Sequence, residues 1–134
     1  MINIPINPNP LPVKQASNIN TLVLAMVGDA VETLYVRTEL TLRADFKAGE
    51  LHRQTSAVVN ANAQAQLMER LLPLLNPDER AVYIRARNSK SNNVPKNTEL
   101  SDYKKATGFE AVLGFLYLTG QNGRLAELLQ DNFE

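Results

Sequence analysis

Apolar residues recur along most of the chain at the three- and four-residue spacing of a helix, and nowhere do they alternate as in a strand. The pattern is clearest where Leu22, Met26, Val27, Ala30 and Leu34 follow one another. It predicts an all-α fold of about six helices. Their expected ranges are 21–42, 49–60, 61–75, 77–87, 98–119 and 124–133.

Residues with capping side chains and helix-breaking residues set the expected ends of these helices. Ser17 or Asn18 is expected to precede the first helix, and Thr98 or Ser101 the fifth. Asn76, with a proline and two acids behind it, is typical of a helix start. In the second helix Leu51, Ala57 and Val58 are expected to point inward, and Gly120 should end the fifth.

The range over which apolar residues keep helical spacing suggests one domain preceded by an N-terminal tail. Residues 1–17 contain four prolines, which disfavour helix and favour extended chain. We therefore expect a tail over 1–17 and a single domain over 18–134. Residues 88–97 lack a hydrophobic period and are rich in turn-forming residues, which predicts a loop.

Composition removes several classes of chemistry. The 134 residues include no cysteine, which excludes disulfides, thiolate catalysis and cysteine-ligated metals, and His52 is the only histidine. No apolar run approaches the roughly 18 residues of a membrane span, and the N-terminus does not resemble a signal peptide. We expect a soluble protein of the cytoplasm with no membrane partner.

The formal net charge is zero, but the charges are unevenly distributed. Residues 80–105 carry seven basic and two acidic side chains, a net charge of +5. A local basic stretch is typical of a surface that binds a nucleic-acid backbone, and it is also compatible with a lysine-rich solvated surface.

Two carboxylates stand in apolar helical segments. Asp29 lies in LAMVGDAVETLYV and Glu110 in GFEAVLGFLYL. A carboxylate in such a setting is costly unless it is paired, hydrogen-bonded or bound to a cation. Asp29 could instead cap a helix with Glu32 at its third position, and Glu110 could be a polar residue on a partly exposed face. Gly114, one turn after Glu110, would let another helix approach closely.

Two carboxylates on separate helices near a basic stretch suggest Mg²⁺. This ion binds oxygen ligands and keeps several waters, so it fills only a few protein positions.

The same segments resemble the ribonuclease III endonuclease domain. Residues 27–31 (VGDAV) resemble one signature helix of that family, and residues 107–114 (TGFEAVLG) resemble the other. The match is closer to the Mini-ribonuclease III subfamily, which lacks a double-stranded-RNA-binding domain. Its hallmarks match here as AMVGDA at 25–30, YVR at 35–37, LH at 51–52, RNSK at 87–90, PKNT at 95–98 and FEA at 109–111.

The resemblance implies a helical homodimer that cuts double-stranded RNA in a Mg²⁺-dependent reaction, leaving a 5′-phosphate and a 3′-hydroxyl. It implies Asp29 and Glu110 as catalytic metal ligands. It also implies the ends of large-subunit ribosomal RNA precursor as substrate, with a ribosomal protein as a possible partner. The RNA contacts expected from the resemblance and the basic stretch are Arg85, Arg87, Asn88, Lys90 and Lys96, with Lys104 and Lys105 as weaker candidates.

The sequence departs from the ordinary ribonuclease III pattern at two acidic positions, which are Ala25 and Thr107 here. The smaller subfamily shares this reduction. One Mg²⁺ per subunit, completed by water, RNA phosphate and Thr107, is therefore the expected site. Two other functions stay open from the residues alone. They are a non-catalytic helical RNA-binding or ribosome-assembly factor, and a helical protein-interaction domain in which Asp29 is only a cap.

Overall fold

The computed structural model describes residues 6–90 and 94–133, and over these ranges the chain is helical with no strand. This confirms the all-α prediction. The order of elements is α1 Val13–Ala16, α2 Thr21–Arg43, α3 Ala48–Val58, α4 Ala61–Leu71, the 3₁₀ turn η1 Leu72–Leu74, α5 Pro77–Arg87, α6 Leu100–Leu118, α7 Asn122–Gln130 and the 3₁₀ turn η2 Asp131–Phe133.

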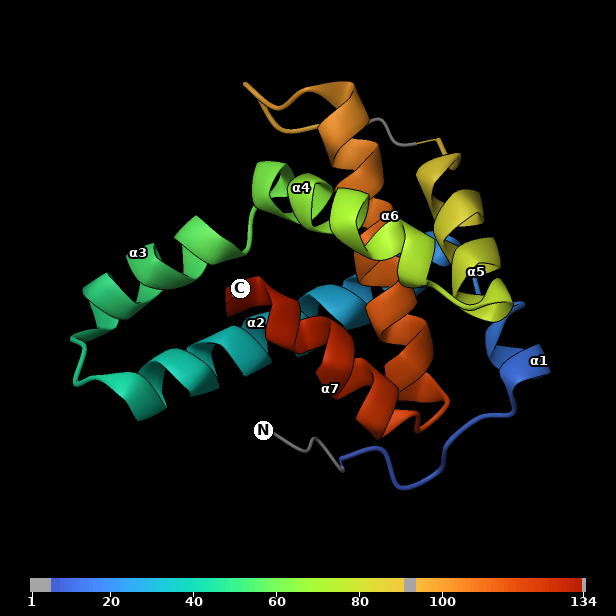
Figure 1. The fold of residues 1–134 in the computed structure, drawn as a ribbon, viewed down its shortest axis with the longest axis horizontal. Coiled ribbons are helices and arrows are strands. Elements are labelled where there is room, and N and C mark those ends of the chain that lie inside the picture. The colour runs from blue at the N-terminus through green and yellow to red at the C-terminus, as the bar shows by residue number, and fades with distance from the viewer. Residues whose placement is uncertain (1–5, 91–93, 134) are drawn as a thin grey trace.

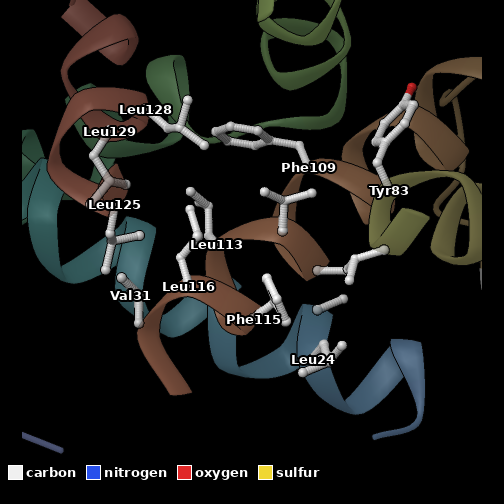
Figure 2. Packing of buried hydrophobic residues seen from close by; sticks show 14 of the residues in the cluster. Leu24, Val31, Tyr83, Phe109, Leu113, Phe115, Leu116, Leu125, Leu128 and Leu129 are labelled. Carbon is white, nitrogen blue, oxygen red and sulfur yellow. The ribbon is translucent and has the colours of Figure 1, made fainter. Parts of the chain in front are cut away.

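Helix α6 runs through the middle of the molecule, and α2, α4, α5 and α7 pack around it (Figure 1). From Ala106 to Leu116 every residue except Glu110 is buried. A helix that is apolar on all sides must be enclosed on all sides, which explains its central place. Figure 2 shows Phe109, Leu113 and Leu116 of α6 meeting Leu125, Leu128 and Leu129 of α7 in the core. Glu110 is therefore the single ionisable residue in the buried part of the central helix.

Several helix starts differ from the expected ones. The side chain of Asn20 accepts hydrogen bonds from Leu22 N and Val23 N at the start of α2, so neither Ser17 nor Asn18 is the cap. Helix α6 begins after Glu99 without a side-chain cap, so Thr98 and Ser101 are wrong as caps too. The expected start at Asn76 is confirmed by a complete capping box with Glu79. Gly120 ends α6 with a positive φ of 69°, as expected.

The expectation that the prolines exclude helix from residues 1–17 is wrong at α1. Pro12 directly precedes α1, where its missing N–H costs nothing because first-turn N–H groups have no acceptor within a helix. Ala16 is fully buried, and Leu11 N donates to Leu118 O at 2.8 Å. This part of the N-terminal segment is therefore packed against the end of α6. The division of the chain at residue 18 stays a prediction.

Helix α3 and the second half of α2 extend away from the other helices (Figure 1). Thr55 is the only fully buried residue of α3. Leu51 and Val58 are half-buried as expected, but Ala57 is exposed, because α3 has too few neighbours to cover that side. No helix of the described residues is long and apolar enough to cross a membrane.

A buried ion pair joins α7 to α5. The Glu79 side chain is completely buried and receives Arg124 Nε and Nη2, each at 2.9 Å. Arg124 Nη2 also donates to Leu74 O at 2.8 Å. The glutamate of the α5 capping box therefore also anchors the C-terminal helix.

Candidate functional site

Helices α2 and α6 touch backbone to backbone at two glycines, Gly28 and Gly114. A Cβ added to Gly28 would overlap the Glu110 carbonyl oxygen and lie 2.7 Å from its carbon. A Cβ added to Gly114 would overlap the Leu24 carbonyl oxygen in the same way and lie 2.9 Å from that carbonyl carbon. The close approach predicted from Gly114 is thus confirmed, with Gly28 as its counterpart. The contact brings Asp29, the next residue in α2, beside Glu110.

Asp29 and Glu110 open onto one pocket of about 460 Å³. Asp29 is exposed and Glu110 is partly buried. The other lining residues come from α2, α4, α6 and the segment before α6, and they are Leu22, Ala25, Met26, Ala61, Gln64, Pro95, Tyr103, Ala106 and Thr107. Two carboxylates from helices far apart in sequence therefore share one solvent-accessible cavity.

Asp29 is not a helix cap. Helix α2 runs without interruption from Thr21 to Arg43, so Asp29 is its ninth residue. The N–H groups of Val31 and Glu32, which a capping Asp29 would serve, lie in the middle of the helix and already have helical acceptors. The capping interpretation of the Asp29–Glu32 pair is therefore wrong. Glu32 is not at a helix start either, and its side chain is buried in the protein interior.

The electrostatics at Glu110 are those of crowded carboxylates. The pKa of Glu110 is raised to about 9, first by burial and then by a hydrogen bond with Asp29 and the charges of Asp29 and Glu32. The Gln64 amide opposes them. A carboxyl with such a pKa carries a proton at neutral pH unless a cation replaces it. The pocket is thus suited to a positive ligand.

Glu32 and Gln64 belong to the same network, although the sequence patterns did not predict them as site residues. Glu32 is 0% exposed, and its Oε1 accepts a hydrogen bond from Gln64 Nε2 at 2.6 Å. Burial raises its pKa to about 7. One signal was available for Glu32, since it is a third carboxylate in an apolar helical run. Nothing in the sequence marks Gln64, which reaches the site through the packing of α4.

The acidic positions lost relative to the ordinary ribonuclease III pattern lie in this pocket. Ala25 and Thr107 both line it. The Thr107 hydroxyl donates to Tyr103 O at 3.0 Å and keeps lone pairs that can accept or ligate. Among residues 6–90 and 94–133 no cluster of three or more Asp, Glu, His or Cys side chains can hold a metal ion. The pocket therefore offers a pair of carboxylates and a hydroxyl.

The five expected RNA contacts lie at the end of α5 and in the segment that leads to α6. Arg85, Asn88, Lys90 and Lys96 are exposed, and Arg87 is half-buried with its guanidinium 5.7 Å from the centre of the Tyr83 ring. The expected loop 88–97 includes residues 91–93, which lie outside the described residues. Lys96 follows Pro95, which lines the carboxylate pocket, so this segment leads from α5 to the rim of the pocket.

Other candidates lie apart from the carboxylate pair. Lys104 and Lys105 are partly buried on α6, and Lys105 Nζ is 3.5 Å from Glu69 Oε1. His52 is exposed on α3, which extends away from the central helix.

Comparison with known proteins shows which proteins the chain is similar to. The ribonuclease III domain family matches residues 22–121. The chain is 43% identical to Mini-ribonuclease 3 of Thermoanaerobacter sp. (strain X514) over 113 residues, which cover 84% of this chain and 80% of the relative. It is 42% identical to Mini-ribonuclease 3 of Brevibacillus brevis, covering 85% of each chain. A crystal structure of a Fusobacterium nucleatum protein is similar with a TM-score of 0.77 and 26% identity, over 84% of this chain and 92% of that one.

Proposed function

Because the chain belongs to the ribonuclease III family, and to its Mini-ribonuclease III members, we propose that this endoribonuclease cuts double-stranded RNA in a Mg²⁺-dependent reaction. The products are a 5′-phosphate and a 3′-hydroxyl. The observation that carries the proposal is the meeting of Asp29 and Glu110 in one pocket at the crossing of α2 and α6.

The residues of the pocket fit Mg²⁺. This ion binds through one or two carboxylates and retains water on its other positions, so a site with two carboxylates is sufficient. Burial, and after it the hydrogen bond and the charge of Asp29, raise the pKa of Glu110, so a cation between the two carboxyl groups would favour their charged forms. Asp29 and Glu110 would hold one ion, with Thr107 at the edge of the site.

In the proposed mechanism, Asp29 and Glu110 bind the cation and fix its place relative to the RNA backbone. When bound, Mg²⁺ supplies an activated water and stabilises the charge that develops on the phosphate. Gln64 donates toward Glu110 and limits the orientations of that carboxylate. The exposed side of Asp29 leaves room for a phosphate group in the pocket.

RNA is proposed to approach along α5 and the segment before α6. Arg85, Arg87, Asn88, Lys90 and Lys96 supply positive charge and hydrogen-bond donors there. An RNA duplex hides the base edges of its major groove, so its shape and its phosphates are the features these residues would recognise. No base-specific reading is needed.

We propose a homodimer built on the outer face of α2. Met26 and Leu34 are 74% and 47% exposed, and with Ile6, Val27 and Tyr117 they line an apolar surface. A second copy would cover this surface and place one active site on each strand of a duplex, because both a dimer and a duplex have two-fold symmetry. Light scattering should give about twice the chain mass of 14.9 kDa. A monomer at all concentrations would contradict the dimer.

The resemblance to Mini-ribonuclease III supports one cellular substrate, the ends of large-subunit ribosomal RNA precursor. We propose that the protein matures this RNA in the cytoplasm, with a ribosomal protein as a possible partner.

Substitution of the two carboxylates tests the enzyme proposal. Asp29→Asn and Glu110→Gln remove formal charge from the site while keeping the size of each side chain, so cutting of a long RNA duplex should fall by orders of magnitude. Both variants should still fold, and chelation of Mg²⁺ should stop RNA cleavage by the wild-type protein. Asp45→Asn, an exposed aspartate in the loop after α2, is the control.

If both variants cut at the wild-type rate, the assigned site is wrong. If the wild-type protein binds the duplex and never cuts it, the protein is the non-catalytic RNA-binding alternative.

A further inference from the structure

A carboxylate lies buried behind the proposed metal site, where an apolar side chain would be expected. Glu32 is 0% exposed in α2, between the buried residues Val31 and Tyr35 and one turn after Asp29. Its Oε2 has no hydrogen-bond partner among the described residues, although the Asn132 side chain lies close enough to favour the charged form. Replacing buried ionic groups by apolar residues of similar volume often stabilises a protein. Packing alone therefore does not account for Glu32.

The hydrogen bond that Glu32 Oε1 accepts comes from Gln64, which also lies beside Glu110. Gln64 Nε2 lies 2.6 Å from Glu32 Oε1 and 3.5 Å from Glu110 Oε2. An amide nitrogen carries two hydrogens, so it can serve both carboxylates at once. The nitrogen thereby joins α2, α4 and α6 at a point next to the proposed cation site.

Glu32 also decides which end of the Gln64 amide faces Glu110. The terminal torsion of a glutamine is nearly two-fold, so its nitrogen and oxygen can exchange places at little cost. A carboxylate at position 32 accepts only from the nitrogen. Without that acceptor, the amide oxygen could turn toward Glu110, where two acceptors would repel each other.

We propose that Glu32 is a positioning residue, which fixes the Gln64 amide so that it holds the Glu110 carboxylate in the orientation that binds the divalent cation together with Asp29. The inference rests on the proposed function. It adds residues that orient the metal ligands. Mutation of such residues commonly lowers metal affinity by about 10–100-fold.

The test measures Mn²⁺ binding to metal-free protein by electron paramagnetic resonance, a readout that does not depend on RNA cleavage. Glu32→Leu and Gln64→Leu should each weaken Mn²⁺ binding by roughly 10–100-fold. The double variant should bind no more weakly than either single one, because both changes break the same link. Glu32→Gln keeps an oxygen that can accept from Gln64 but adds a donor that allows the other amide orientation, so it should weaken Mn²⁺ binding less than Glu32→Leu does.

The matched control is Gln66→Leu, an exposed glutamine of α4 whose amide bonds Asn62 Oδ1 at 3.1 Å, and it should leave Mn²⁺ binding unchanged. Urea unfolding accompanies each measurement. A general structural role would lower the free energy of unfolding in parallel with Mn²⁺ affinity, whereas the positioning role lowers affinity alone. If Glu32→Leu does not fold, Gln64→Leu carries the test.

The outcomes separate the two proposals. If Asp29→Asn abolishes Mn²⁺ binding while Glu32→Leu and Gln64→Leu bind as wild type does, the positioning role is overturned and the metal site stands. If the wild-type protein binds no Mn²⁺, the metal site and the positioning role both fail.

Discussion

Alanine at Gly28 is the sharpest test of the helix crossing. Its Cβ would overlap the Glu110 carbonyl oxygen and lie 2.9 Å from Gly114 N, and ordinary contact begins at 3.4 Å. Because the obstacle is backbone, the helices must separate by on the order of 1 Å in an interior packed like a crystal. Such overpacking costs about 3 kcal/mol at the upper end, and the better helix propensity of alanine offsets about 1 kcal/mol. We expect the free energy of unfolding to fall by about 2 kcal/mol.

Gly123 provides the matched control, because it also lies in a helix and a Cβ there would have nothing within 4 Å. Gly123→Ala should be neutral or stabilising by up to about 1 kcal/mol. Urea unfolding of both variants measures the difference, and RNA cleavage by Gly28→Ala should fall by about 100-fold because Glu110 moves relative to Asp29. A Gly28→Ala protein as stable and as active as Gly123→Ala would refute the reasoning.

Three further predictions concern other parts of the structure. Arg124→Ala should lower the free energy of unfolding by about 3–5 kcal/mol, because it leaves the fully buried Glu79 carboxylate without its cation; urea unfolding measures this. In metal-free protein, stability should fall as pH rises above about 4.5, because the raised pKa values of Glu32 and Glu110 favour the folded state only while these groups are protonated; the Glu32 part of the fall should be complete near pH 7. In the Glu32→Gln variant the free energy of unfolding should fall less with pH, by up to about 3 kcal/mol, as measured by thermal unfolding across pH. Identical pH profiles of the variant and the wild-type protein would contradict this prediction. Lys90→Ala combined with Lys96→Ala should flatten the log–log dependence of duplex affinity on salt by roughly one to two units, whereas an unchanged slope would mean that these lysines contact no phosphate.

The helices were largely predictable because apolar residues recur at helical spacing or, in α6, occupy nearly every position. Phe109, Val112 and Leu113 are fully buried, and so are Ala111 and Phe115 on the other sides of α6. Helix starts were less predictable. Several residues near each end can cap, and only the folded chain decides which one does, as at Asn20. The sequence does not predict the short helix α1, because prolines disfavour helix at most positions, but a proline is well tolerated directly before a helix.

The two carboxylates of the pocket were predictable, whereas the residues that contact them were not. Asp29 and Glu110 could be singled out because each is a carboxylate in an apolar run that matches a family signature. Gly114 predicts a close helix approach, but no local pattern says which helix packs there. Gln64 is an ordinary helix residue in sequence, and its role depends on contacts made 32 and 46 residues away. Such long-range contacts are fixed by packing, which periodicity does not specify.

The glycine contact between α2 and α6 also has a mechanical consequence. Two rods that touch at one point can swing like scissors about that point, and displacement grows with distance from the pivot. The end of α2 at Arg43 lies about 22 Å along the helix from Gly28, so a swing of about 5° moves it by about 2 Å. Side chains within about 5 Å of the pivot move by only about 0.4 Å in the same swing. Asp29 and Glu110 lie beside that pivot, so any change in the crossing angle of α2 and α6 would alter the separation of the two carboxylates far less than the position of Arg43.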